Sequence, residues 1–313
     1  MVVFLYLLLL GGALSALIIG SDWFVESSEK LGIKLGISPY VVGVTIVALG
    51  TSLPELASSI TAILQEESSI VTGNVIGSNI TNILLVLGAV AVFQRTITFD
   101  SNVVNVDLPI LSMSAFLAVF VLMDENYSLI EGGLLIVAFG LFLINTFRSQ
   151  IVLPEINTKL RKEPLGLRTI LFLILGAVFV YFGSEYTIVS ISELSLLLSV
   201  NSDFIALTIL ALGTSLPELV VSLQAAKKGN TGIAVGNVIG SNIFNTFGVL
   251  GISRLFGVIV IPKNISEFGI FYALAVTLIL VIMTRSQRIT RFEGGMLLVL
   301  YLYYIVELSQ NLF

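Results

Sequence analysis

Long apolar runs separated by short polar breaks dominate the chain. An α-helix needs about 20 residues to cross a bilayer, and runs of about that length fall at 2–23, 38–64, 70–93, 104–123, 128–147, 168–190, 202–226, 231–255, 265–284 and 291–312. We therefore predict an all-α membrane protein with ten transmembrane helices. No Lys or Arg precedes the first run, so we interpret it as a retained spanning helix and not as a cleaved signal peptide.

Two pairs of identical peptides show that the chain is one half duplicated. Gly-Thr-Ser-Leu-Pro-Glu occurs at 50–55 and 213–218, and Gly-Asn-Val-Ile-Gly-Ser-Asn occurs at 73–79 and 236–242. The offset is 163 residues for both motifs. Each copy holds five of the predicted helices, and an odd number makes the second copy enter the membrane from the opposite side. We predict two inverted-topology five-helix repeats.

A polar connector separates the two repeats. It covers 148–167, contains several basic residues and two prolines, and is too short to fold as a soluble domain. We expect the first repeat at 1–147, a cytoplasmic connector at 148–167 and the second, inverted repeat at 168–313.

The basic residues test this topology, because cytoplasmic loops of membrane proteins are enriched in Lys and Arg. With the N-terminus outside, all of the 15 Lys and Arg residues except Arg254 and Lys263 fall in the predicted inner loops. Acidic residues such as Glu66 and Asp124 fall outside. The expected location is the cell membrane, multi-pass, with both termini outside.

Composition agrees with this class and removes several chemistries. The chain is 56% hydrophobic and 11% charged, with a mean hydropathy of +1.04. It has no Cys and no His, which excludes disulfides, thiol catalysis, imidazole proton relays and most transition-metal sites. We expect no cofactor, no nucleic-acid partner and no protein partner, with the lipid bilayer as the surroundings and a monomer as a sufficient state.

Two carboxylates lie inside apolar segments at equivalent places, Glu55 and Glu218. A charged residue at the centre of a membrane helix costs about 2.5–3.5 kcal/mol on insertion scales, so such residues mark functional sites. Pro54 precedes Glu55 and cannot donate to the carbonyl of Gly50. We therefore predict that the second helix kinks or breaks there and exposes backbone carbonyls.

Further polar side chains lie before and after the two carboxylates at helical spacing. They are Thr51, Ser52, Ser59, Asn74, Ser78 and Asn82 in the first repeat and Thr214, Ser215, Ser222, Asn237, Ser241 and Asn245 in the second, with Ala48 and Ala211 on the same faces. Inverted symmetry predicts that these faces meet near the midplane. A wide cage of oxygen atoms with a charge of about −2 suits Ca²⁺ better than Mg²⁺, and two Na⁺ ions balance the same charge.

Each feature also has a structural interpretation. The glycines of Gly73–Gly77 and Gly236–Gly240 form small-residue packing motifs. Serine and threonine hydroxyls in membrane helices often bond to their own backbone, and a single membrane glutamate can be a protonated core residue. Asp22 and Glu185, which the offset also relates, are expected to be interfacial or capping residues.

At the two duplicated motifs the sequence resembles the calcium/cation antiporter superfamily, and most closely its prokaryotic sodium/calcium exchangers. The resemblance runs the length of the chain. It implies a fold in which the second, third, seventh and eighth helices form the core, while the first and sixth slide across it. It also implies more than two Na⁺ ions exchanged for each Ca²⁺.

The resemblance also implies a set of ion ligands. Calcium is bound by Glu55 and Glu218 with the backbone at Thr51 and Thr214; sodium additionally uses Ala48, Ser52, Ser78, Ala211, Ser215 and Ser241, and Asn82 and Asn245 complete the centre. Potassium-dependent relatives have Asp where this chain has Asn245, so we expect no potassium requirement. Proton/calcium exchangers have Glu where this chain has Gly77 and Gly240, so a proton/calcium antiporter is the alternative function.

Two other classes are less consistent with the residues. A serine hydrolase built on Ser52 or Ser215 needs a base such as His or Lys, and the predicted core has neither. A cation channel also places carboxylates at the midplane, but inverted repeats of broken helices favour a site exposed to each side in turn. We predict a sodium/calcium antiporter and not an enzyme.

Overall fold

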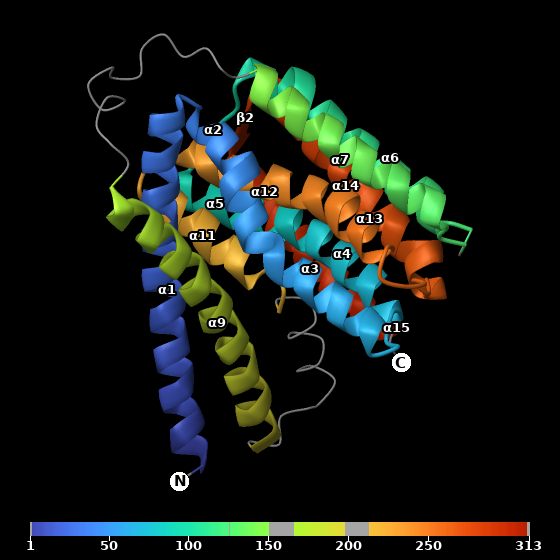
Figure 1. Cartoon of the computed structure of the whole chain (residues 1–313), viewed down its shortest axis with the longest axis horizontal. Helices are drawn as coiled ribbons and strands as arrows, with labels where there is room; N and C mark the ends of the chain where they lie inside the picture. Colours follow the sequence, from blue (N-terminus) through green and yellow to red (C-terminus); the bar gives the residue numbers. More distant parts are fainter. Residues whose placement is uncertain (1, 125, 150–165, 198–212, 312–313) are drawn as a thin grey trace.

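The computed structural model describes residues 2–124, 126–149, 166–197 and 213–311, and most of these residues are helical (Figure 1). Within them, eight helices are long and apolar enough to cross a membrane by length and composition. The predicted helical membrane class is therefore confirmed. Two of the ten predicted spans are not among these eight. The run 291–312 forms the helix α15 (Arg291–Asn311), and the run 202–226 lies partly outside the described residues.

The elements of the first half form five candidate spans. In order they are α1 (Val2–Leu35), α2 (Pro39–Val42), η1 (Gly43–Val47), α3 (Ala48–Leu64), α4 (Ser69–Thr81), η2 (Asn82–Leu87), α5 (Gly88–Gln94), β1 (Thr96–Thr98), η3 (Val103–Asp107), α6 (Leu108–Leu122) and α7 (Leu129–Ser149). The segments η1, η2 and η3 are π-helical turns that continue the neighbouring α-helices. They form the continuous spans Pro39–Leu64, Ser69–Gln94 and Val103–Leu122.

The described part of the second half is also mostly helical. Its elements are α9 (Leu167–Leu197), α11 (Leu216–Lys227), α12 (Thr231–Ile243), η4 (Phe244–Val249), α13 (Leu250–Ser253), η5 (Ile265–Gly269), α14 (Ile270–Met283), η6 (Thr284–Ser286), β2 (Arg288–Thr290) and α15 (Arg291–Asn311). Most of the predicted connector, 150–165, lies outside the described residues.

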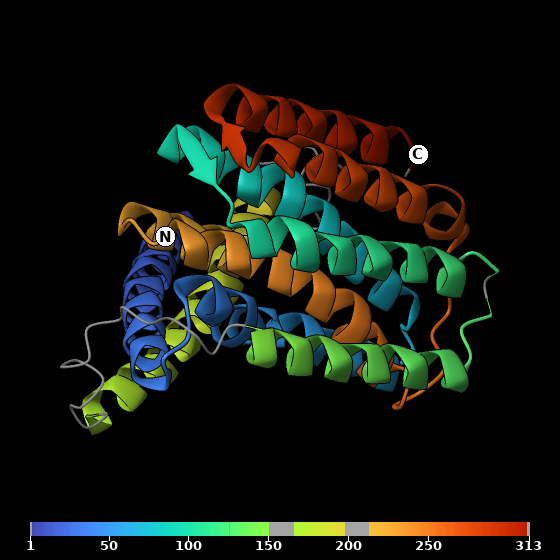
Figure 2. The same ribbon diagram turned by 90° about the horizontal axis from the view of Figure 1, so that it is seen from above.

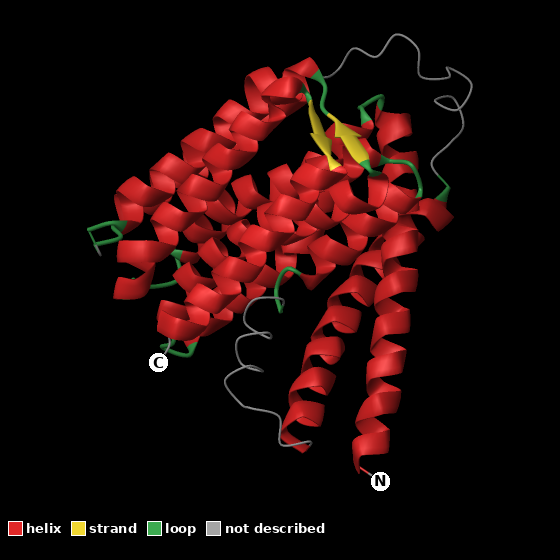
Figure 3. Cartoon of the chain, turned by 180° about the vertical axis from the view of Figure 1, so that it is seen from behind, coloured by secondary structure: helices red, strands yellow, loops and turns green. Residues whose placement is uncertain are grey.

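The helices α1 and α9 form a long pair beside the remaining bundle (Figures 1 and 3). Glycines allow their backbones to approach closely, because a Cβ atom on Gly20 would lie 2.9 Å from the backbone nitrogen of Val180, and one on Gly183 would lie 2.6 Å from that of Leu17. Gly20 and Gly183 are related by the 163-residue offset. The crossing is thus made by equivalent positions of the two repeats.

The first helix is longer than the apolar run that predicted it. It was expected to end near residue 23, but it continues to Leu35. The extension is polar and contains an ion pair between Glu26 and Lys30, one helical turn apart with Nζ and Oε1 at 2.6 Å. Such i,i+4 pairs support a helix beyond its apolar part, so hydrophobic length alone underestimated it.

Segments carrying the duplicated motifs occupy the centre of the bundle. An apolar stretch of 18 residues within Thr231–Ser253 is entirely buried, whereas only 11% of the residues in the corresponding stretch of α1 are buried. Seen from above, α6, α7, α14 and α15 run along the sides of this centre (Figure 2). Gly236 lets α12 lie directly against η1, since a Cβ atom there would meet the backbone nitrogen of Val44 at 2.7 Å.

We predicted a kink or a break at Pro54, and in the first repeat the helix does not break there. The helix α3 runs from Ala48 to Leu64 with Pro54 inside it, and the irregular turn lies earlier, at η1. One missing N–H removes a single intrahelical bond, which the rest of this helix tolerates. In the second repeat Pro217 lies in the first turn of α11, where its missing N–H interrupts no helical bond, and residues 213–215 form a turn.

A small β-sheet corrects the purely helical prediction. The strands β1 and β2 pair antiparallel, with Ile97 opposite Ile289 and both side chains fully buried (Figure 3). The backbone N–H of Phe99 extends the pairing by donating to the carbonyl of Gln287 at 2.9 Å. Three-residue strands are too short to show a periodic pattern, and their partners are distant in sequence. The sheet joins the end of α5 to the start of α15.

Candidate ion-binding site

Both motif carboxylates lie in the interior, and side chains from both repeats surround them. Glu55 on α3 and Glu218 on α11 have no exposed surface. The hydroxyl of Ser52, from the other repeat, donates to Oε1 of Glu218 at 3.0 Å, and that of Ser241 on α12 donates to the same oxygen at 3.4 Å. The two repeats therefore build one site.

Two asparagines support the carboxylate-bearing turns in the same way. Asn74 Nδ2 donates to the backbone carbonyl of Glu55 at 3.4 Å and to the hydroxyl of Ser59 at 3.3 Å. Asn237 Nδ2 donates to the backbone carbonyl of Glu218 at 3.5 Å and to Ser222 at 3.0 Å. The duplication in the sequence thus reappears as duplicated hydrogen bonds.

Further bonds tie one motif to the other repeat. The hydroxyl of Thr51 donates to Oδ1 of Asn237 at 3.0 Å. The hydroxyls of Ser78 and Thr214 lie 2.8 Å apart. These contacts hold α3 against α12 and α4 against the turn before α11, which fixes the four motif segments around one centre.

Several polar atoms at the centre are buried without a hydrogen-bond partner among the described residues. They are both carboxylate oxygens of Glu55, Oε2 of Glu218, Oγ of Ser215, and the side-chain oxygen and nitrogen atoms of Asn82 and Asn245. Unpaired buried polar groups cost about 1–3 kcal/mol each, and more when charged. Because most of these atoms are oxygens and two carboxylates contribute, the arrangement fits a hard cation as its substrate.

The other predicted site residues are placed as follows. Ala48 is buried on the same helix as Thr51 and Ser52, and Thr214 is partly exposed. Ala211 lies outside the described residues. Asn82 begins η2 and Asn245 lies in η4, so the two central asparagines occupy π-helical turns at equivalent places. Such turns occur often at functional sites.

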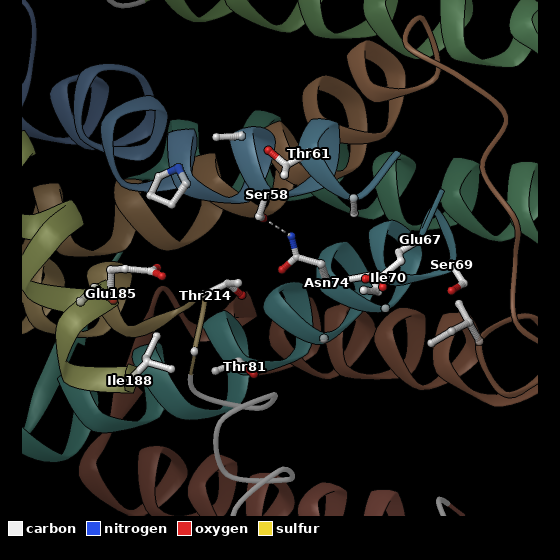
Figure 4. A pocket seen from close by; sticks show the side chains of 18 of the residues that line it. Ser58, Thr61, Glu67, Ser69, Ile70, Asn74, Thr81, Glu185, Ile188 and Thr214 are labelled. Carbon is white, nitrogen blue, oxygen red and sulfur yellow. Dashed lines mark hydrogen bonds between the residues drawn. The ribbon is translucent and has the colours of Figure 1, made fainter. Parts of the chain in front are cut away.

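A cavity of about 740 Å³ extends from this centre toward the α3–α4 turn. Its walls include Pro54, Gly77 and Thr214, which neighbour the site, and Gln65 and Glu185, which lie farther out. In Figure 4, Asn74 points toward Ser58 across the upper part of this space, and Glu185 of α9 borders it. Glu185 lies inside α9 and lines the cavity, so it is not a capping residue, while its predicted interfacial position stays a prediction.

The last residue of each Gly-Ser-Asn motif has a role that sequence analysis did not assign. Asn79 Nδ2 donates to the hydroxyl of Thr246 at 2.9 Å, and Asn242 Nδ2 donates to the backbone carbonyl of Asn79 at 3.1 Å. They join α4 to α12 and η4 across the repeats. Their identical place in both motifs was the available signal, but spacing alone does not tell a ligand from a packing contact.

The packing interpretation of the motif glycines holds for one copy. A Cβ atom on Gly240 would lie 2.7 Å from the Cβ of Ala48, so that helix packs there only without a side chain. Around Gly73 no described atom lies within 4 Å, and for Gly77 the nearest is the hydroxyl of Tyr304 at 3.9 Å. Gly73 and Gly77 line the cavity instead.

The pattern that defines the family described as "Sodium/calcium exchanger protein" matches residues 5–148 and 168–309. The chain belongs to this family. As a member of the sodium/calcium exchanger family it is a cation/calcium antiporter of the membrane, not an enzyme. The match leaves out residues 149–167, between its two parts.

The alignments with individual relatives cover nearly the whole of this chain. "Sodium/calcium exchanger MaX1" of Methanosarcina acetivorans is 34% identical, with 97% of this chain and 98% of that protein covered. "Putative antiporter CaxA" of Alkalimonas amylolytica is 34% identical over 92% of this chain and 93% of that protein. Among solved structures, the sodium-calcium exchanger NCX_Mj matches with a TM-score of 0.85 and 32% identity, covering 97% of this chain and 99% of that one.

Proposed function

We propose that this antiporter exchanges Na⁺ for Ca²⁺ by exposing the site between Glu55 and Glu218 to each side of the membrane in turn. The observation that carries the proposal is the buried pair of carboxylates surrounded by unpartnered oxygens, which both repeats contribute. One Ca²⁺ or two Na⁺ ions balance the two negative charges. The two cations therefore compete for the same oxygens, and this competition is the basis of exchange.

In this proposal the predicted ligands keep their roles. Calcium binds Glu55, Glu218 and the backbone at Thr51 and Thr214; Na⁺ also uses Ala48, Ser52, Ser78, Ala211, Ser215 and Ser241, with Asn82 and Asn245 at the centre. The hydrogen bonds from Ser52 and Ser241 to Glu218 support it, because these hydroxyls already face the carboxylate. A cation arriving at Glu218 meets their oxygens as well.

We propose that the protein has ten spanning helices in two inverted repeats, 1–147 and 168–313. In this topology the connector 148–167 lies in the cytoplasm and both termini lie outside. The distribution of Lys and Arg supports this orientation. Pairing of β1 with β2 is compatible with it, because the orientation assigns the loops at residues 95 and 287 to the same side. A monomer contains every residue of the proposed site.

The relatives favour Na⁺ over protons as the coupling ion. MaX1 is named a sodium/calcium exchanger, and NCX_Mj was studied after soaking with Na⁺ and Sr²⁺ or Ca²⁺. Gly77 and Gly240 stand where the resemblance places Glu in proton/calcium exchangers. A carboxylate at Gly240 would also collide with α3, since even a Cβ atom there lies 2.7 Å from that of Ala48.

Calcium-45 uptake into proteoliposomes tests the proposal. Vesicles loaded with Na⁺ and diluted into Na⁺-free buffer should accumulate calcium, whereas vesicles with an outward potassium gradient or an outward proton gradient should not. Uptake driven equally well by the proton gradient in Na⁺-free solutions would favour the proton/calcium alternative.

A further inference from the structure

Polar side chains fasten the inner part of α1 to the turn between α11 and α12. Lys228 Nζ lies 2.9 Å from Oδ1 of Asp22 and 3.6 Å from Oε2 of Glu26, and it also donates to the backbone carbonyl of Asp22 at 3.2 Å. Next to it, Asn230 Nδ2 donates to Oε2 of Glu29 at 2.8 Å. One lysine thus joins the long peripheral helix to the segment that carries Glu218.

The 163-residue offset relates this ion pair to a second pair of positions. Asp22 corresponds to Glu185 on α9, and Lys228 corresponds to Gln65 at the end of α3. The acidic residue is kept in both repeats, but the lysine is replaced by a neutral amide. Glu185 and Gln65 both border the cavity, and within the described part of the chain no ion pair is found at Glu185.

The backbone shows that Gln65 and Lys228 are structurally equivalent. Each follows the last residue of its helix, with φ/ψ of −92°/6° for Gln65 and −79°/1° for Lys228. The next residue has a positive φ in both turns, 65° at Glu66 and 81° at Gly229. The two turns therefore present their side chains from the same position, and the difference between them is the charge.

We propose that Asp22 and Lys228 form a one-sided latch that favours the conformation seen here, closed at the α11–α12 end and open at the α3–α4 end. This inference rests on the proposed alternating access, in which opening the α11–α12 end separates α1 from that turn. Closure of the opposite end gains no matching ion pair, because Gln65 carries no charge. The two repeats thus contribute equivalent residues to the ion site, but only the Asp22–Lys228 end has an ion pair.

The expected size of the bias is moderate. The side chains of Lys228 and Asp22 keep 25% and 45% of their exposure, so solvent screens their attraction. Partly exposed ion pairs of this kind change a two-state population ratio by about 1.4- to 5-fold. Removing the latch should therefore shift the balance between the two conformations without abolishing either.

Cysteine labelling measures this balance, because the native chain has no Cys. Ile188 lines the cavity on α9, so Ile188→Cys in proteoliposomes should react with an impermeant thiol reagent from the α3–α4 side. Adding Lys228→Gln should slow that reaction, by at most the roughly 1.4- to 5-fold change expected in the population ratio, because the rate follows the fraction of the open conformation. The matched control is Lys227→Gln, which removes the same charge from the neighbouring exposed residue and should leave the rate unchanged.

Two further variants separate the latch from a folding defect. Asp22→Asn should slow labelling, but no more than Lys228→Gln does, because Lys228→Gln also removes the contact with Glu26. The double variant should be no slower than Lys228→Gln alone. Gln65→Lys places a cation opposite Glu185 and should also slow labelling, because it creates the missing latch. Equal rates for all variants, or equal effects of Lys227→Gln and Lys228→Gln, would overturn the inference even if Na⁺-driven calcium uptake persists. Loss of uptake in the wild type would instead count against the proposed function.

Discussion

Ser52 and Ser215 occupy the same motif position, yet the structure places them in different hydrogen-bonding environments. Ser52 donates to Oε1 of Glu218 at 3.0 Å, and its side chain is fully buried. The hydroxyl of Ser215 is also buried but has no partner among the described residues. We predict that Ser52→Ala destabilises the ion-free protein and that Ser215→Ala does not.

The magnitude follows from the hydrogen bond that is lost. A bond to a charged group contributes about 1.5–3 kcal/mol, and its removal leaves Glu218 with Ser241 as its remaining hydroxyl donor at 3.4 Å. We expect the free energy of unfolding to fall by about 1.5–3 kcal/mol in Ser52→Ala. Ser215→Ala removes a buried hydroxyl that has no partner among the described residues, and burying such a group costs about 1–3 kcal/mol, so this variant should be at least as stable as the wild type.

Equilibrium unfolding in mixed dodecylmaltoside and SDS micelles, in Na⁺- and Ca²⁺-free buffer, measures the difference. Since both hydroxyls are proposed sodium ligands, both variants should also need more Na⁺ for half-maximal exchange. Equal loss of stability in the two variants, or a larger loss in Ser215→Ala, would refute the assigned hydrogen bond. Unequal stability with unchanged Na⁺ dependence would refute only the ligand role.

Three other predictions concern topology, charge movement and packing. Single cysteines at Lys227 and Asp124 should be labelled by impermeant reagents only from the cytoplasmic and external sides, respectively, and labelling of both from one side would break the inverted arrangement. Exchange of more than two Na⁺ for one Ca²⁺ moves net charge, worth about 2.3 kcal/mol per charge at 100 mV, so a valinomycin-imposed potential should alter Na⁺-driven uptake; no change would indicate neutral exchange. Gly236→Leu should prevent folding because a Cβ atom there meets the backbone of η1, whereas Gly133→Ala, with no described atom within 4 Å, should fold and transport normally in a fluorescence size-exclusion and uptake assay.

The sequence predicted which polar side chains meet in the interior better than it predicted the shape of the helices. Duplicated motifs identified Glu55 and Glu218 because a buried carboxylate at two equivalent places has few structural explanations. Their interior location and the contribution of both repeats follow from that pattern and were found. Ser52 donates to a carboxylate, whereas Ser215 has no partner within the part of the chain that the structure describes. Such a difference depends on small differences in packing that identical motifs cannot encode.

Features that depend on distant contacts or on local compensation could not be predicted. The β1–β2 pairing joins residues about two-thirds of the chain apart, and each strand has only three residues. Pro54 was expected to kink or break its helix, but α3 continues through it without a break and the irregular turn falls at η1. The polar end of α1 remained helical through its own ion pair, which a hydropathy pattern does not register.

Calcium binding to the purified, ion-free protein tests the central claim most directly, because it asks whether Glu55 and Glu218 form one site that Na⁺ and Ca²⁺ share. Isothermal titration should detect saturable Ca²⁺ binding that increasing Na⁺ suppresses competitively. Glu55→Gln and Glu218→Gln should each abolish the signal while the protein stays monodisperse, and Glu131→Gln, a glutamate on α7 outside the site, should keep it. Calcium binding with wild-type affinity in either site variant, or binding that Na⁺ does not affect, would contradict the account.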